Sequence, residues 1–297
     1  MNWKLKCLAF YALGSAPLGD RFYRTLQGNV TGRYYQEITD ELLAAYSYHV
    51  DNFLRLPAPA ESDAMEFGAG RNLLTPLLLS AAGAREVHVF DIDRLATTEQ
   101  VNYVIRQLTS RNHPIVKGGW REIQDLDEDL RRLYRIRYCA PADARDTRLP
   151  TDSIDFICST STLEHIKRDD ISSILAESQR ICTPNGLLSF IIDYHDHYAT
   201  ADPGITRFNF YRYSEKSWRW FNPPNHFQNR MRHSDYELLF DESGLTALEH
   251  RPVIPTEDFR YLDNMPMSKA FSHYSSEDLL ALNGFFLLKG NQSEVTR

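Results

Sequence analysis

From Asp63 onward, short apolar runs alternate with stretches in which apolar residues recur every three or four positions. The first pattern is typical of buried strands and the second of amphipathic helices. The strands predicted in this way are 64–70, 85–93, 136–142, 154–160, 186–193, 245–255 and 279–290. The helices predicted between them are 71–83, 97–111, 121–133, 168–182 and 234–244, the last with Ser234 as its N-cap. This alternation predicts an α/β fold, a doubly wound, Rossmann-like, mostly parallel sheet with helices on both faces.

Two parts of the chain depart from the alternation. Residues 1–58 carry aromatic and leucine residues at helical spacing and end at the linker "PAPAESD", so we expect an N-terminal helical segment. Residues 194–234 follow the fifth predicted strand and hold many Tyr, Trp, His, Asn and Pro residues without a regular period. We interpret 1–58 as a lid segment, 59–297 as the main domain, and 194–234 as an inserted lid that contacts the substrate.

Composition narrows the class of protein. The chain has 297 residues, of which 42% are hydrophobic, and this is enough for a sizeable core. A net charge of −7 without a long Lys/Arg run argues against a nucleic-acid partner. The four cysteines show no C-x-x-C spacing and no apolar run reaches membrane-spanning length. We therefore expect a cytoplasmic protein with reduced thiols and no membrane span, although the first residues loosely imitate a signal peptide.

Candidate binding residues lie where the predicted strands end, because ligands of doubly wound sheets bind at the carboxyl ends of the strands. The first strand runs into "EFGAGRN", where Gly68 and Gly70 let the backbone approach a ligand closely. Asp91 ends the second strand and can accept hydrogen bonds from a ribose diol. Asp143 follows the third strand, and Ser159 lies at the end of the fourth.

Four motifs in this order resemble the class I S-adenosylmethionine-dependent methyltransferases of the small-molecule branch: "EFGAG", "VFDID", "ADARDTRLPTDSIDFI" and "LEHI…ESQRICTPNGLLSF". The resemblance implies S-adenosyl-L-methionine as the cofactor. It also implies cofactor contacts by Glu66, Gly68, Ala69, Gly70, Asp91, Ile92, Asp143, Ala144 and Ser159. A nicotinamide-binding domain fits less well, since the G-x-G-x-x-G fingerprint requires glycine where Leu73 stands. Many members of the family carry a further glycine at the position of Asn72, and this sequence departs from them there.

The hexapeptide "DYHDHY" directly follows the fifth strand. On an extended chain Asp193, His195 and His197 would share one face. We expect one histidine, with His197 preferred, to act as general base toward a hydroxyl acceptor, and Asp193 to orient it. Two alternatives remain open. One is a divalent metal held by the same three residues, which would require the backbone to curl, and the other is a polar turn without chemistry. No metal is assigned. In the "LEH" segment, Glu164 and His165 are expected to orient the loop rather than take part in chemistry.

The insertion is the predicted acceptor site. Its aromatic residues, among them Trp218 and Trp220, suit a small or glycan-like acceptor, and arginines could hold a phosphate or carboxylate. These arginines are Arg207, Arg212, Arg230 and Arg232. The "NPPN" segment resembles the N-P-P-aromatic signature of adenine-N6 methyltransferases, but it follows the fifth strand instead of the fourth, so nucleic acid is not expected. We predict an O-methyltransferase of polysaccharide or secondary-metabolite biosynthesis. The alternatives are methylation of a small amine and a regulatory protein that binds the cofactor without turnover.

Overall fold

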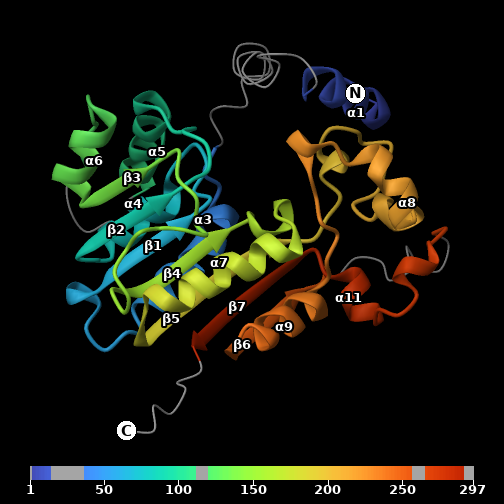
Figure 1. Cartoon of the computed structure of the whole chain (residues 1–297). Helices are drawn as coiled ribbons and strands as arrows, with labels where there is room; N and C mark the ends of the chain where they lie inside the picture. Colours follow the sequence, from blue (N-terminus) through green and yellow to red (C-terminus); the bar gives the residue numbers. More distant parts are fainter. Residues whose placement is uncertain (1, 15–36, 112–119, 256–264, 291–297) are drawn as a thin grey trace, which may run out of the picture.

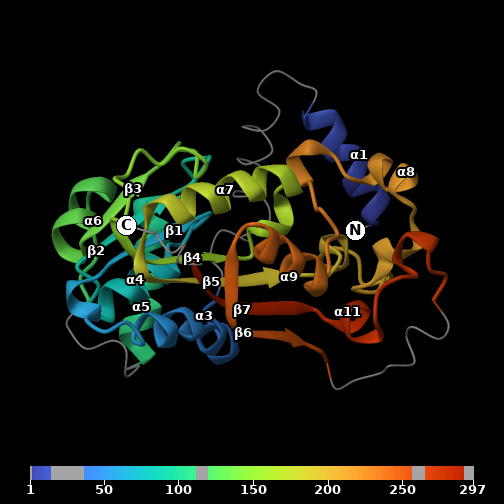
Figure 2. The ribbon, with the colours of Figure 1, turned by 60° about the horizontal axis from the view of Figure 1, so that its bottom comes forward.

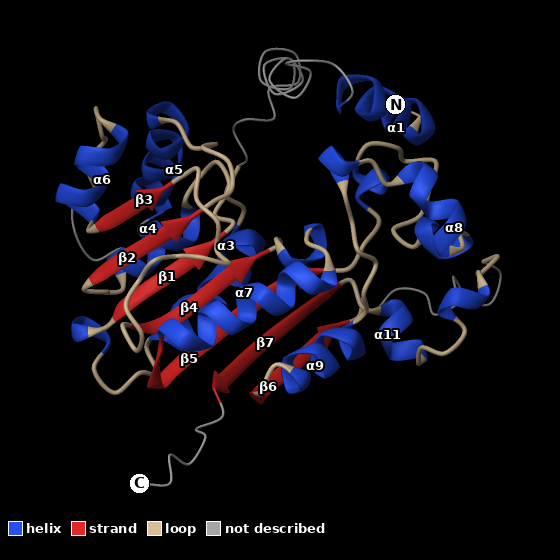
Figure 3. Ribbon diagram, in the orientation of Figure 1, coloured by secondary structure: helices blue, strands red, loops and turns tan. Residues whose placement is uncertain are grey.

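The apolar runs form one seven-stranded sheet with the strand order β3-β2-β1-β4-β5-β7-β6 (Figure 1). This computed structural model describes residues 2–14, 37–111, 120–255 and 265–290. The strands are β1 (Asp63–Phe67), β2 (Glu86–Phe90), β3 (Ile136–Cys139), β4 (Ile154–Thr160), β5 (Cys182–Asp193), β6 (Leu245–Val253) and β7 (Asn283–Gly290). The first five run parallel, whereas β7 is antiparallel to both of its neighbours, as the arrows of Figure 3 show. The predicted doubly wound α/β fold is confirmed.

Helices cover both faces of the sheet (Figure 2). One face packs against α3 (Asp40–Phe53), α4 (Leu74–Ala81), α5 (Thr98–Arg111) and α6 (Leu126–Tyr134). The opposite face packs against α7 (Arg168–Ile181) and α9 (His233–Glu242). Successive strand residues supply the two faces in turn: Ala64 belongs to the first cluster and Met65 to the second, and neither is exposed. Both faces of the parallel strands are therefore buried, as near-continuous apolar runs predict.

A second, smaller core lies beyond the carboxyl edge of the sheet. It joins α1 (Trp3–Gly14), α8 (Glu215–Trp218) and α11 (Ser276–Leu280) with short 3-10 turns. These turns are η3 (His197–Thr200), η4 (Asn209–Arg212), η5 (Arg219–Phe221), η6 (Pro224–His226) and η7 (Lys269–Phe271). The ring of Trp3 packs on Tyr198 and Phe221 at centroid distances of 5.3 and 4.9 Å. The segment 1–58 thus contributes to two places, since α1 packs on the insertion (Figure 1) while α3 packs on the sheet.

Several element boundaries differ from the predicted ones because side chains cap the backbone elsewhere. Helix α9 begins at His233, so Ser234 is not its N-cap. The N–H of Arg232 donates instead to the carboxylate of Asp235 at 2.7 Å. Helix α6 begins only at Leu126, because the carboxylate of Asp125 accepts the first backbone N–H groups of the helix. A carboxylate that satisfies free N–H groups fixes a helix start more strongly than the apolar pattern does.

Strands β5 and β7 begin at other residues than the apolar runs predict. Strand β5 begins at Cys182 instead of residue 186, because Cys182 pairs with Ile154 and the register then shifts before Leu187. The "TPNG" segment is therefore an irregular part of the strand rather than a break before it. The predicted strand 279–290 begins only at residue 283, and its first part ends helix α11. Periodicity alone cannot assign a short apolar run to a helix or a strand.

All four cysteines are free, and complete burial raises the pKa of the Cys158 thiol well above its ordinary value. None of the helices in the described ranges has the length and apolar character needed to cross a bilayer.

Candidate cofactor and acceptor site

A cavity of about 680 Å³ opens at the carboxyl edge of the sheet, between the loops that follow β1 to β4 and the insertion. Five of the predicted cofactor residues line it: Gly68, Asp91, Ile92, Asp143 and Ala144. Three separate strand ends therefore converge on one space, as expected for a ligand site of a doubly wound sheet.

The glycine loop is tightly seated. Gly68 has a φ of +72°, and its N–H donates to the carbonyl of Phe90 at 2.8 Å. A β-carbon on Gly68 would lie 2.3 Å from Cγ2 of Thr162, whose hydroxyl also donates to the Gly68 carbonyl at 3.1 Å. Gly70 has a φ of +67°, but a β-carbon there would meet open space. The loop thus needs glycine at residue 68 for both conformation and space, and at residue 70 for conformation.

The carboxylate of Asp91 is buried and fixed by the backbone. Its Oδ2 accepts the N–H of Gly70 at 2.9 Å, and its Oδ1 accepts the N–H of Asp93 at 3.1 Å. A carboxylate oxygen can accept a further hydrogen bond, so both oxygens suit a ribose diol. Ile92 lines the cavity and is 65% exposed, so it offers an apolar face to a purine ring.

Asp143 is held in place by Arg145. The guanidinium donates to its carboxylate through Nε at 3.0 Å and Nη2 at 2.7 Å. This hydrogen bonding keeps the pKa of Asp143 below its ordinary value, so the carboxylate is ionised and can accept a hydrogen bond from an adenine amine. Ala144 lines the cavity beside it. The glycine cradle, the two acids and the apolar wall together fit an adenosyl group.

The other predicted cofactor residues lie outside the lining of this cavity. Glu66 is buried under the loop, where the hydroxyl of Thr160 lies 3.4 Å from its Oε1, and burial raises the pKa of Glu66 to about 8. The hydroxyl of Ser159 donates to the carbonyl of Phe67 at 2.9 Å and links β4 to β1. Ala69 packs against the core on the α3 side of the sheet. These residues support the loop from below.

The chain turns after β5 instead of staying extended, and His197 opens the 3-10 turn η3. The two histidines of the hexapeptide nevertheless both face Asp193. Its Oδ1 accepts hydrogen bonds from the backbone N–H and from Nδ1 of His195, and its Oδ2 lies 3.5 Å from Nε2 of His197. Burial acts to raise the pKa of Asp193, but the contacts with both imidazoles outweigh it and hold the pKa well below its ordinary value. Asp193 is therefore an anion between two imidazole rings.

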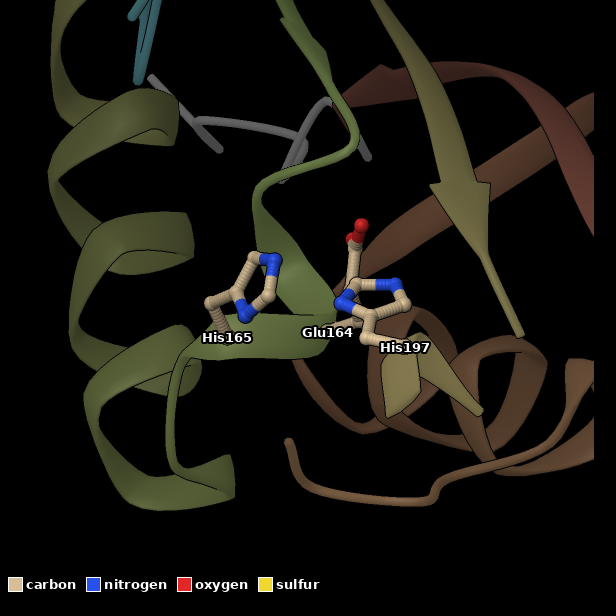
Figure 4. A group of neighbouring side chains, drawn as sticks. All are labelled: Glu164, His165 and His197. Atoms are coloured by element: carbon tan, nitrogen blue, oxygen red, sulfur yellow. The ribbon is translucent and has the colours of Figure 1, made fainter. Parts of the chain in front are cut away.

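The turn after β4 places two further side chains, Glu164 and His165, beside this histidine cluster. Figure 4 shows the side chains of Glu164, His165 and His197 beside one another, and their potential ligand atoms lie within 4.8 Å of one another. Glu164 is only 2% exposed, and within the described part of the chain neither carboxylate oxygen has a partner with hydrogen-bond geometry. Burial, together with the charge of Asp193, raises the pKa of Glu164 well above its ordinary value. The sequence pattern suggests only a loop-orienting role for Glu164 and His165, because nothing in "LEH" reveals that η3 folds back onto it.

His197 lies between two cavities. Its ring centroid is 4.7 Å from that of His165, which lines the cofactor cavity, and 5.0 Å from that of His195. His195 lines a second cavity of about 420 Å³ together with Asp193, Thr200 and Arg207. The histidine cluster therefore connects the space that fits an adenosyl group with a polar neighbouring space.

The aromatic residues of the insertion are placed differently from the prediction. Trp218 is buried in the small core and Trp220 is 76% exposed, and neither lines either cavity. The insertion instead reaches the cofactor cavity through Asn222, Pro224 and Phe227. Two of these belong to "NPPN", which was set aside because of its place after the fifth strand; the fold carries it back to the edge of the sheet.

Of the four arginines proposed to hold an anionic group, Arg207 lines the second of these two cavities and the other three line neither. Arg230 and Arg232 are buried, and both donate to backbone carbonyls: Arg230 to residues 210 and 213, Arg232 to residues 194, 278 and 281. They hold the insertion together, so they are not available to an acceptor. Arg212 is exposed at the end of η4 and lines neither cavity.

The sequence matches the model of a methyltransferase domain over residues 35–250, and the chain belongs to this family. With the strand order and the glycine-and-acid site, the match defines a class I S-adenosylmethionine-dependent methyltransferase, and S-adenosylmethionine is its cofactor. No curated protein sequence matches the chain.

The fold is similar to that of solved structures, three of which have the following identities and coverages. A chain from the complex of the Haloferax volcanii Trm112 methyltransferase activator is 13% identical, with a TM-score of 0.48 and coverage of 90% of this chain and 97% of that one. The PH0226 protein of Pyrococcus horikoshii OT3 is 11% identical, with a TM-score of 0.48 and coverages of 91% and 98%. An S-adenosylmethionine dependent methyltransferase of Mesorhizobium loti is 13% identical, with a TM-score of 0.43 and coverages of 80% and 95%.

Proposed function

We propose that the chain transfers the methyl group of S-adenosylmethionine to a hydroxyl oxygen of a small, polyhydroxylated or sugar-like acceptor. The sulfonium donor is already activated, so the protein mainly has to align the acceptor oxygen with the methyl group and remove its proton. The acceptor would lie between the histidine cluster and the insertion, with α1 and the insertion as its cover. The packing of Trp3 on Tyr198 supports this assignment of the cover, because it joins α1 to the residues that follow β5.

The observation that carries the proposal is the pair formed by Asp193 and His195. Because Asp193 is ionised, the hydrogen bond between them requires Nδ1 of His195 to be the donor. The lone pair of this imidazole then lies on Nε2, the nitrogen that would take a proton from the acceptor. His195 also lines the polar cavity, whereas Nε2 of His197 is buried against Asp193. The geometry therefore favours His195 over His197 as the general base.

The test combines cofactor calorimetry with transfer of labelled methyl groups to matched panels of hydroxyl and amine acceptors. We expect His195→Ala to bind S-adenosylmethionine as the wild type does and to lose about 10²-fold or more in turnover. His273→Ala, at an exposed position, is the matched control. Transfer only to amines would replace the proposal by N-methylation. Cofactor binding without transfer to any acceptor would favour the regulatory alternative, and wild-type turnover in His195→Ala would remove the base.

A further inference from the structure

We propose that a divalent first-row transition-metal ion binds at the carboxyl ends of β4 and β5, held by Glu164, His165 and His197 (Figure 4). These three residues offer one ligand atom each, and the three atoms lie within 4.8 Å of one another. Asp193, His195 and His197 form a second group with the same spacing, and His197 belongs to both groups. Asp193 is therefore the neighbour of a ligand.

The buried carboxylate of Glu164 is the independent observation that points to a ligand. Both of its oxygens are enclosed. The backbone N–H groups of Glu164 and Asp193 lie near the carboxylate and act to lower its pKa, but among the residues the structure describes none reaches either oxygen with hydrogen-bond geometry. A second carboxylate, that of Asp193, lies close enough to disfavour a charge on Glu164. A buried carboxylate without a full set of partners is costly unless it is protonated or meets a cation. A divalent ion bound by Glu164 would balance its charge beside that of Asp193.

The distances and the surrounding hydrogen bonds suit coordination. Two ligand atoms at about 2.1 Å from a tetrahedral ion are about 3.4 Å apart, and the three ligand atoms here already lie within 4.8 Å of one another. Oδ2 of Asp193 lies 3.5 Å from Nε2 of His197 and can orient that ring. The hydrogen bond of His165 Nδ1 to the carbonyl of Phe227 at 2.8 Å leaves its Nε2 for the metal. Hydrogen bonds of this kind, from a ligand's far atom to a neighbouring group, typically orient metal ligands.

The ligand set selects the class of ion. Two imidazoles and one carboxylate suit zinc, manganese, iron or cobalt and leave a coordination position for a substrate oxygen, whereas magnesium and calcium prefer oxygen ligands only. His195 is not needed as a ligand, because its Nδ1 donates to Oδ1 of Asp193 and so leaves Oδ2 directed at His197. In this arrangement His195 positions Asp193 and keeps Nε2 as a base.

The role of the ion rests on the proposed function. An acceptor hydroxyl bound to the ion would have a lowered pKa, because the cation stabilises the alkoxide. The O–H bond breaks as its proton passes to Nε2 of His195. The oxygen then forms a bond to the methyl carbon while the carbon–sulfur bond breaks, and the neutral sulfide leaves with the bonding electrons. His165 lines the cofactor cavity, so an ion beside it would lie next to the methyl donor.

The test measures metal binding separately from methyl transfer. Protein purified without chelator is analysed by inductively coupled plasma mass spectrometry, and metal-free protein is titrated with zinc, manganese and cobalt chlorides in a calorimeter. We expect one ion per chain, with d–d absorption from bound cobalt. Glu164→Gln and His197→Gln each change a ligand and should weaken binding by at least about tenfold, since loss of an outer-shell partner alone costs about tenfold to a hundredfold. Retained S-adenosylmethionine binding would show that these variants are folded.

A matched control comes from the group His233, Glu237 and His250, which also has metal-ligand spacing but is partly exposed. His250→Ala should leave the ion in place. Loss of the ion in His250→Ala together with retention of the ion in His197→Gln would overturn the site. Substoichiometric metal together with weak titration by all three chlorides would overturn it too, and would indicate a protonated Glu164. A stoichiometric ion without methyl transfer to any acceptor would leave the site standing and refute only the proposed function.

Discussion

The N–H of Gly70 donates to Oδ2 of Asp91 at 2.9 Å, so the glycine loop after β1 is tied to the acid that ends β2. Asp91 therefore has two tasks, because the same carboxylate orders the loop and faces the cavity. Asp91→Ala should lower the affinity for S-adenosylmethionine by at least about tenfold, the loss expected when a hydrogen bond to a charged group is removed. Calorimetric titration of the cofactor measures this.

Asp93 is the control for that change. It contributes its backbone N–H to Asp91, which Asp93→Ala would preserve. An unchanged affinity in Asp93→Ala would assign the ribose contact to Asp91 alone. A loss as large as that of Asp91→Ala would show that both carboxylates bind the ribose.

Substitutions of the two glycines should differ in cost. Both positions have positive φ, so an alanine costs about 1 kcal/mol at either one. At Gly68 the added methyl also meets Thr162, and overpacking of this kind costs about 1–3 kcal/mol more. Gly68→Ala should therefore be less stable toward urea than Gly70→Ala by that amount. Combining Gly68→Ala with Thr162→Ala should recover part of the difference, and equal stabilities of the two single variants would contradict the close packing.

The two tryptophans of the insertion should separate into a core residue and a surface residue. Trp218 is 3% exposed and packs under the guanidinium of Arg230, whereas Trp220 is 76% exposed. Trp218→Ala should cost about 3–5 kcal/mol in free energy of unfolding, and Trp220→Ala less than about 0.5 kcal/mol. Urea unfolding measures both. A selective loss of acceptor affinity in Trp220→Ala would instead place this residue in the acceptor site, as the aromatic content of the insertion had suggested.

The sheet and the cofactor loops were predictable because their determinants are local. An apolar run that ends in a glycine or an acid specifies both a buried strand and the residue at its tip, as at Gly68 and Asp91. The parallel topology then brings these tips together without further information. Where a capping side chain inside the predicted helix decides its start, as Asp125 does for α6, the pattern misplaces the boundary.

The acceptor side was less predictable because long-range packing determines it. Arg232 looks like an anion-binding residue in the sequence, yet it donates to three backbone carbonyls from α11 and the turn after β5. Glu164 resembles a loop residue until η3 brings His197 against it. Neither relationship has a spacing rule, since the partners are far apart in sequence and lie in irregular segments.

Glu66 gives the last prediction, a dependence of stability on pH. Burial raises the pKa of its carboxyl from 4.5 to about 8 in the folded protein. Between these values the folded state keeps a proton that the unfolded state has lost, so the free energy of unfolding falls as pH rises through this window, with a limiting slope of about 1.4 kcal/mol per pH unit. Glu66→Gln carries the amide in place of the protonated carboxyl and should lack this contribution.

The stability of Glu66→Gln relative to the wild type should therefore increase from pH 5 to pH 8 in urea titrations. The exposed Glu128→Gln serves as the control and should show no such trend. A difference that stays constant with pH would mean that Glu66 is ionised in the folded protein and paired with a donor. If Glu66→Gln keeps its stability but loses affinity for S-adenosylmethionine, Glu66 contacts the cofactor, as the family motif implies, instead of supporting the loop from below.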